Sequence, residues 1–154
     1  TINSDINTIW SFITDFSRSL LCNRFHTDLE LPANYSLGKM KKFNIIHNFG
    51  FGNYEMVAEI TEYSPPKHLC ISEFKKEDKR KGFPHTIEYQ IEPNREKSKL
   101  LYTVIGTYGG RVQDMSFKPI LKGVMIEELL KIKNAIESSD KTAKPITTET
   151  VKLI

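Results

Sequence analysis

The N-terminal part of the chain carries the hydrophobic pattern of an amphipathic helix. Over residues 5–16 apolar side chains recur at intervals of three and four, which is the spacing of one helix face. Ser4 or Asp5 can cap this helix, because a short side-chain oxygen accepts a hydrogen bond from an otherwise unpaired backbone N–H. Trp10 shares the apolar face, and we interpret it as a structural residue. The following residues, through Asn34, predict only irregular structure or a short second helix.

The period changes to two after residue 38, which is typical of strands with one buried face. Strands are predicted at residues 39–48, 54–63, 69–74, 85–92 and 99–108, separated by short turns rich in Gly, Pro or charge. One face of these strands carries Tyr54, Met56, Ala58, Ile60, His85, Ile87, Tyr89 and Ile91, with Tyr102 on the corresponding face of the last strand. Consecutive strands with short connections predict an antiparallel meander with one solvent-exposed side.

Gly109 and Gly110 end the last strand, and a long helix is predicted at residues 117–138. Ser116 is the expected N-cap, and Pro119 then falls in the first turn, where proline is tolerated. We interpret Gly123 as a close crossing over the sheet. One broad apolar face is formed by Phe117, Leu121, Val124, Met125, Leu129, Ile132 and Ile136. Residues 139–154 are predicted to be a flexible tail, or to add a strand at residues 151–154.

This order of elements predicts an α+β fold in one domain spanning residues 1–138. The sheet and the last helix each have a single apolar side, and the simplest way to bury both is to wrap the sheet around the helix. The chain has 154 residues, enough for one domain with a substantial core.

Four local phrases in this order resemble the START-like, or SRPBCC, superfamily. They are INTIWSFITD at residues 6–15, EITEYSPPKHL at 59–69, IEYQIEP at 87–93 and IKNAIE at 132–137. The superfamily includes Bet v 1-like proteins, polyketide cyclases/dehydrases and lipid-transport domains. The resemblance implies a helix-grip fold, in which an antiparallel sheet wraps around a long C-terminal helix. Members of this family begin with a full strand before the first helix, of which only residues 1–3 remain here.

The resemblance also implies a cavity between the sheet and the last helix that binds a hydrophobic or amphipathic small molecule or lipid. The side chains expected to line it are Tyr54, Met56, Tyr89, Tyr102, Leu121, Met125, Glu128 and Leu129. The residues alone do not decide between a hollow and a filled interface, and the default expectation is a filled core, because protein interiors are normally close-packed.

Glu128 and His85 are the candidates for catalytic residues. On a helical wheel Glu128 falls within the apolar face of the last helix, where an unpaired carboxylate is costly. It is either at the border of that face or a polar anchor, or base, inside the cavity. His85 shares a strand face with Ile87 and Tyr89, and we interpret it as a hydrogen-bonded structural histidine, with acid–base chemistry as the alternative.

Other kinds of site receive no support from sequence spacing. The four histidines, His26, His47, His68 and His85, show neither an HExxH motif nor zinc-finger spacing, so no metal and no cofactor is predicted. His68 is expected to be solvated beside the Pro65–Pro66 turn. The turn containing Gly50 and Gly52 is interpreted as a hairpin whose glycines permit unusual backbone angles, with a phosphate-binding loop as the alternative.

Charge and cysteine content narrow the partners and the compartment. The net charge of +3 equals the charge of residues 75–81 alone, so we expect a solvated hairpin tip, with an anionic lipid or phosphate patch as the alternative. No nucleic acid or integral membrane contact is predicted. Cys22 and Cys70 have mainly apolar neighbours and are expected to be buried free thiols. These, together with an N-terminus that lacks the pattern of a signal peptide, favour a cytoplasmic protein.

The predicted fold and its apolar interface are compatible with three functions. The first is a binder of a hydrophobic small molecule, and the second is a cyclase- or dehydratase-like enzyme that uses the same cavity. The third is a protein-interaction module like the Hsp90 activators, which would have a filled interior. The ligand and the oligomeric state are left open.

Overall fold

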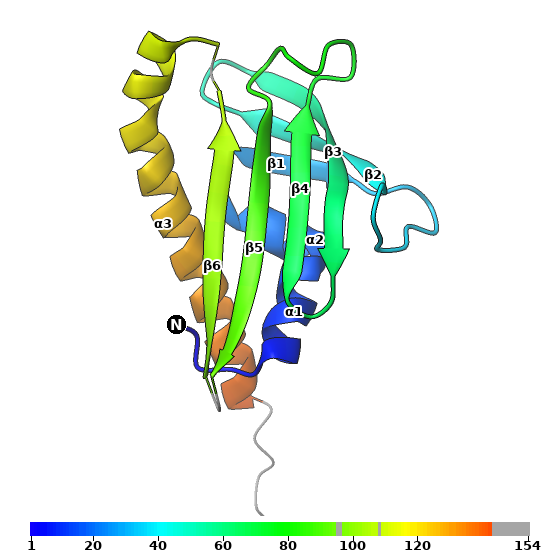
Figure 1. Cartoon of the computed structure of the whole chain (residues 1–154), viewed down its shortest axis with the longest axis vertical. Helices are drawn as coiled ribbons and strands as arrows, with labels where there is room; N and C mark the ends of the chain where they lie inside the picture. The colour runs from blue at the N-terminus through cyan, green and yellow to red at the C-terminus, as the bar shows by residue number, and fades with distance from the viewer. Residues whose placement is uncertain (95–96, 108, 143–154) are drawn as a thin grey trace, which may run out of the picture.

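The computed structural model describes residues 1–94, 97–107 and 109–142 (Figure 1). Three short helical segments come first: α1 (Ile6–Thr14), α2 (Phe16–Ser19) and the 3₁₀ turn η1 (Leu20–Cys22). The strands are β1 (His26–Glu30), β2 (Lys42–Asn48), β3 (Asn53–Ser64), β4 (His68–Phe74), β5 (His85–Asn94) and β6 (Lys97–Gly106). The long helix α3 (Arg111–Thr142) follows.

The six strands form one antiparallel sheet in chain order, β1-β2-β3-β4-β5-β6. The sheet is strongly curled, so β1 and β2 cross behind β4 to β6, and α3 runs along the β6 side (Figure 1). The predicted α+β helix-grip fold is therefore confirmed. Ile2 exchanges two backbone hydrogen bonds with Ser98 of β6, at 2.9 and 3.0 Å, so the start of the chain pairs with the last strand.

Helix α1 forms as its sequence predicts. The Asp5 carboxylate accepts hydrogen bonds from the backbone N–H groups of Asn7 and Thr8 at 2.8 and 3.1 Å, which caps two otherwise unpaired donors. The helix ends at Thr14, two residues before the predicted end. Trp10 is buried and packs on Tyr63 with ring centroids 5.6 Å apart, so its structural interpretation is confirmed.

The core lies between the inner face of the sheet, α1 and the C-terminal half of α3. The strand alternation is confirmed, because Met56, Ala58 and Ile60 of β3 are buried, as are Ile87, Tyr89 and Ile91 of β5. Of the predicted apolar face of α3, Val124, Ile132 and Ile136 are buried, and Phe117, Leu121, Met125 and Leu129 are half-buried.

The segment between α2 and β2 departs from the prediction. Residues His26–Glu30, expected to be irregular or helical, form the edge strand β1 and pair with β2. The register shifts between His26 and Asp28, so the strand lacks the regular alternation that would have identified it.

Helix α3 begins earlier and ends later than predicted, at Arg111 and Thr142 instead of 117 and 138. Its first turn is held by the N–H of Asp114, which donates to the Gly110 carbonyl at 2.9 Å. Ser116 is therefore not a cap, and its hydroxyl bonds to the Val112 carbonyl. Pro119 lies inside the helix, where it removes one backbone hydrogen bond.

Two further expectations for the end of the chain are affected. A Cβ placed on Gly123 would meet nothing within 4 Å, so this glycine does not mark a close crossing. Residues 139–142, assigned to the tail, belong to α3, whereas the strand predicted at residues 151–154 lies outside the described residues. The predicted strand 39–48 is observed as β2, which begins three residues later and ends as predicted. The predicted strand 99–108 is observed as β6, which begins and ends two residues earlier.

The solvent side of α3 is unusually apolar. Val112, Met115, Ile126 and Leu130 are each at least half exposed on this side of the helix. None of the described helices combines the length and the apolar character needed to cross a membrane.

The charged residues 75–81 lie in the connection between β4 and β5, as expected for a hairpin tip. Their charges are partly paired locally, since Arg80 and Lys81 both contact Asp78.

Cys70 is buried, Cys22 is half-buried, and the two thiols are free.

Candidate functional site

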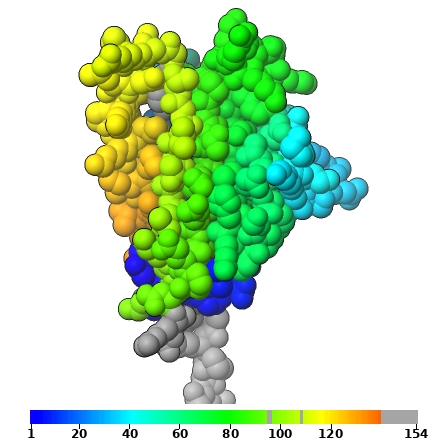
Figure 2. All heavy atoms as spheres, viewed as in Figure 1, coloured from blue at the N-terminus to red at the C-terminus, as the bar shows by residue number. Residues whose placement is uncertain are grey.

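A cavity of about 340 Å³ lies between the inner face of the sheet and the N-terminal half of α3. In the space-filling view the surface is hollowed between this half of α3 and β6 (Figure 2). The aromatic part of the wall is Phe25, Phe49, Phe83 and Tyr102, and the aliphatic part is Ile87, Val104, Ile105, Leu121 and Met125. The polar side chains are Asn23, His26, His47, His85, Thr107, Asp114 and Lys118.

The phenylalanines form a continuous aromatic wall. Phe49 lies next to both Phe25 and Phe83, with ring centroids 5.1 Å apart in each pair. Phe49 belongs to the turn between β2 and β3, in which Gly50 and Gly52 both have positive φ angles. The hairpin turn that contains Gly50 and Gly52 thus places the ring of Phe49 in the cavity wall.

The predicted cavity residues fall into two groups. Tyr102, Leu121 and Met125 line the cavity. Tyr54, Met56, Tyr89, Glu128 and Leu129 are not among the lining residues. Met56, Tyr89 and Glu128 are fully buried, and Tyr54 and Leu129 are half-buried.

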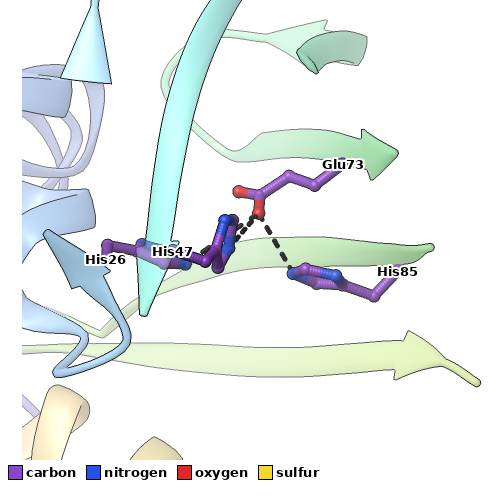
Figure 3. Close-up of side chains that lie close together, drawn as sticks. All are labelled: His26, His47, Glu73 and His85. Carbon is purple, nitrogen blue, oxygen red and sulfur yellow. Dashed lines mark ion pairs between the residues drawn. The ribbon is translucent and has the colours of Figure 1, made fainter. Parts of the chain in front are cut away.

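Three histidines and one glutamate converge at the wall of this cavity (Figure 3). The Nε2 atoms of His26, His47 and His85 lie 3.9, 2.9 and 3.2 Å from Oε2 of Glu73. Each comes from a different strand: β1, β2 and β5 for the histidines and β4 for Glu73. Strand pairing places His47 beside His26 of β1, and Glu73 beside His85 of β5. The curl of the sheet brings these two pairs together.

The cluster is deeply buried. The side chains of His26, His47 and Glu73 are at most 2% exposed, and that of His85 is 17% exposed. Although the Nε2 atoms lie near Glu73, the contacts lack hydrogen-bond alignment, and both Glu73 oxygens and both His47 ring nitrogens have no hydrogen-bond partner among the described residues. Unpartnered buried polar atoms are rare in native proteins.

The surroundings shift the ionisation of these groups in different directions. Burial lowers the pKa of His26 to about 4, despite the opposing effect of Glu73. Burial would also lower the pKa of His85, but the Glu73 carboxylate outweighs it and raises that pKa above its ordinary value. Burial would raise the pKa of Glu73, but the positive charges that His85 and His26 carry in acid outweigh it and hold that pKa well below the usual range. Glu73 is therefore an anion, and His26 is neutral, at pH 7.

A second polar group, centred on Glu128 of α3, lies close to the cavity. Its Oε2 accepts hydrogen bonds from Tyr102 Oη at 2.7 Å and from Asn23 Nδ2 at 2.9 Å. Tyr89 Oη donates to Oε1 at a longer 3.5 Å. The side chain is fully buried, so Glu128 does not lie at the border of the apolar face of α3. Asn23 and Tyr102 separate its carboxyl group from the cavity, since both line it.

Burial raises the pKa of Glu128 to about 7, although the hydrogen bonds from Tyr102 and Asn23 oppose this rise. Burial and the nearby Glu128 charge raise the pKa of Tyr89 well above its usual value, and Tyr102 shows the same rise. The carboxyl group can therefore exchange a proton near neutral pH, while both phenols stay protonated and act as donors.

His68, expected to be solvated, lies on the outer face of the sheet. Its Nε2 is 2.8 Å from Glu88 Oε1 and 3.4 Å from Cys70 Sγ, and the side chain is 31% exposed. It is remote from the cavity wall.

The prediction from the sequence identified His85 and Glu128 but missed His26, His47 and Glu73. A signal for two of them was present in the strand alternation. His47 continues the inward series Phe43 and Ile45, and Glu73 continues Leu69 and Ile71. Polar residues in an inward register indicate a buried polar cluster, but its members meet only in the folded sheet.

No family model matches the sequence, and no curated protein matches it either. Solved structures with the same fold do match over most of the chain. A conserved protein of Geobacillus kaustophilus is 18% identical, with a TM-score of 0.66, and the match covers 90% of this chain and 91% of that one. A protein of Thermus thermophilus is 11% identical, with a TM-score of 0.64, and 94% of each chain is covered.

The di-domain ARO/CYC protein StfQ of the steffimycin biosynthetic pathway also shares the fold. It is 12% identical, with a TM-score of 0.67 over 92% of this chain. The chain spans about half of StfQ, since the match covers 49% of that protein. At these identities the likeness establishes the helix-grip fold.

Proposed function

We propose that this protein binds a compact amphipathic molecule in the cavity between the sheet and α3. The observation that carries the proposal is the cavity itself, in which an aromatic and aliphatic wall surrounds a few polar side chains. Ligand sites are typically concave and mostly apolar, with a small number of polar groups that orient the ligand.

The size of the cavity favours a particular kind of ligand. At about 340 Å³ it is near the lower end of the range of roughly 300–1,000 Å³ for small-molecule sites. A molecule with one or a few rings suits this volume and the aromatic wall better than a long-chain lipid does. His85 and Tyr102 offer polar contacts on the sheet side, and Asp114 and Lys118 offer them on α3.

A cyclase- or dehydratase-like enzyme is the second candidate. It is favoured by two ionisable groups next to one cavity, the histidine–glutamate cluster and Glu128, whose pKa of about 7 suits proton transfer near neutral pH. The shared fold with StfQ is consistent with this alternative. The interaction-module hypothesis called for a filled interior, so the cavity favours the other two.

Binding of the fluorescent probe 1-anilinonaphthalene-8-sulfonate to the folded protein tests the proposal. Leu121→Trp puts a large ring into the cavity and should weaken probe binding at least about tenfold, which corresponds to about 1.4 kcal/mol of binding free energy. Ile126→Trp, on the exposed side of the same helix, is the matched control and should leave binding unchanged. Equal affinity in the two variants would place the probe outside the cavity and contradict the proposal.

Native mass spectrometry of the gently purified protein adds a direct readout. A small molecule retained by the wild-type chain and lost from Leu121→Trp is the expected result. Retention by both variants would contradict occupancy of this cavity.

A further inference from the structure

We propose that His26, His47, His85 and Glu73 bind a divalent first-row transition-metal ion, with Zn²⁺ as the reference ion, at the cavity wall. The proposal rests on the side-chain cluster alone and does not depend on the organic ligand proposed above.

The spacing of the ligand atoms suits such an ion. All four lie within 4.8 Å of one another, and the three Nε2 atoms lie 2.9 to 3.9 Å from Glu73 Oε2. Bonds of about 2.0–2.2 Å in a tetrahedral zinc site place ligand atoms roughly 3.3–3.6 Å apart. Small rotations of the side chains therefore suffice to surround one ion.

Hydrogen bonds to the backbone orient two of the imidazoles correctly. His26 Nδ1 lies 2.8 Å from the Leu20 carbonyl oxygen, and His85 Nδ1 lies 2.8 Å from the Phe83 carbonyl oxygen. A carbonyl oxygen can only accept, so each Nδ1 carries the proton. In the neutral ring, Nε2 then presents its lone pair to the centre of the cluster. Metal-ligating histidines in proteins are usually held by such a bond from the other ring nitrogen.

An ion would also give a further partner to groups that are ion-paired within the cluster but have no hydrogen bond. Both oxygens of Glu73 and Nε2 of His47 are buried without a hydrogen-bond partner among the described residues. One cation at the centre of the cluster would contact all three histidines and the carboxylate at once. Without an ion, the single Glu73 carboxylate has to serve all three imidazoles, and it lies 3.9 Å from the one on His26.

The ligand types select the class of ion. Imidazoles suit Zn²⁺, Fe²⁺, Co²⁺, Ni²⁺ and Cu²⁺, whereas Mg²⁺ and Ca²⁺ require mainly oxygen ligands. The three histidines line the cavity, while Glu73 does not. A bound ion would therefore be held by Glu73 from behind and by the three histidines at the cavity wall. A molecule in the cavity could reach the ion only as a fifth ligand, an expansion that zinc allows.

A second group, His68, Cys70 and Glu88, provides a natural control. Its potential ligand atoms are also within 4.8 Å of one another, but it lies on the outer face of the sheet. His68 Nε2 is already engaged by Glu88 at 2.8 Å, and the side chains of His68 and Glu88 are only partly buried. His68→Ala removes this group without altering the cavity wall.

Isothermal titration of the chelator-treated protein with Zn²⁺ alone tests the proposal. One saturable site per chain is expected. His85→Ala and Glu73→Gln should each weaken binding at least about tenfold, and His68→Ala should leave it unchanged. Absence of a saturable site, or a site lost in His68→Ala and kept in His85→Ala and Glu73→Gln, would overturn the proposal.

Two measurements on the wild-type chain keep the test valid if a variant fails to fold. Co²⁺ should give visible d–d absorption, which excess Zn²⁺ removes. Imidazole NMR signals of His26, His47 and His85 should shift on addition of Zn²⁺, with the signal of His68 as the internal control. Shifts confined to His68 would overturn the proposal. Because neither measurement uses an organic ligand, failure of probe binding and failure of metal binding are separate results.

Discussion

Tyr102 of β6 donates its hydroxyl proton to Glu128 of α3 across 2.7 Å, and this bond joins the sheet to the helix beside the cavity. The carboxyl group is fully buried, and Asn23 is its second close donor. Burial thus favours the protonated carboxylic acid, while the two donors favour the carboxylate. The pKa of about 7 expresses the balance between them.

The stability of Glu128→Gln relative to the wild type should increase as the pH rises. The pKa of Glu128 is raised from 4.5 to about 7, so the folded state binds more protons than the unfolded state between these values. Its contribution to stability is complete below pH 4.5 and is lost as the pH rises through 7. The difference in unfolding free energy between variant and wild type should therefore grow by about 3 kcal/mol over this window.

Urea unfolding at pH 4.5, 6 and 8 measures this difference. His26, whose pKa is lowered to about 4, has the opposite pH dependence, but it is present in both proteins and cancels in the comparison. A difference that stays constant with pH would show that Glu128 is not protonated on folding.

Tyr102→Phe should destabilise the protein more at pH 8 than at pH 5. At pH 8 the variant leaves a buried carboxylate without its closest donor, at a cost of about 1.5–3 kcal/mol. At pH 5 the partner is a neutral carboxylic acid, and the cost falls to about 0.5–1.5 kcal/mol. Tyr63→Phe, on the far side of the core against Trp10, is the control and should show no such pH dependence in chemical denaturation.

Two glycines should respond in opposite ways to substitution by alanine. Gly123→Ala, in the exposed side of α3 with open space around it, should raise the unfolding free energy by up to about 1 kcal/mol. Gly106→Ala places a Cβ 2.5 Å from the Cβ of His85 and 2.8 Å from the rigid Pro84 carbonyl. It should lower the melting temperature, with a loss of about 1–3 kcal/mol. Equal melting temperatures for the two variants would contradict this packing of His85.

The fold was largely predictable from the sequence because most of its elements have a regular period. Most inward residues of β3 and β5 occupy every second position, and α1 has both its cap, Asp5, and a clear apolar face. The start of α3 was not predictable, since its first turns expose Val112 and Met115 and lack a buried stripe. Residues of β1 were missed because a register shift interrupts their alternation.

The candidate site was only partly predictable, for a different physical reason. Glu128 is conspicuous because a carboxylate interrupts an apolar helix face, and His85 is conspicuous beside Ile87 and Tyr89. The association of His26, His47 and Glu73 depends instead on how strongly the sheet curls, a property of six paired strands that no local period contains.

Each strand of the sheet pairs with its neighbour along the chain, and this order governs how the site can assemble during folding. Hairpins close short loops and form early, whereas contacts between distant segments form later because their loop-closure entropy is larger. Consecutive hairpins can bring His26 to His47 and Glu73 to His85 while α3 is still undocked. Glu128 meets Tyr102 only when α3 packs onto the sheet, so the pairs His26–His47 and Glu73–His85 can form before the cavity closes.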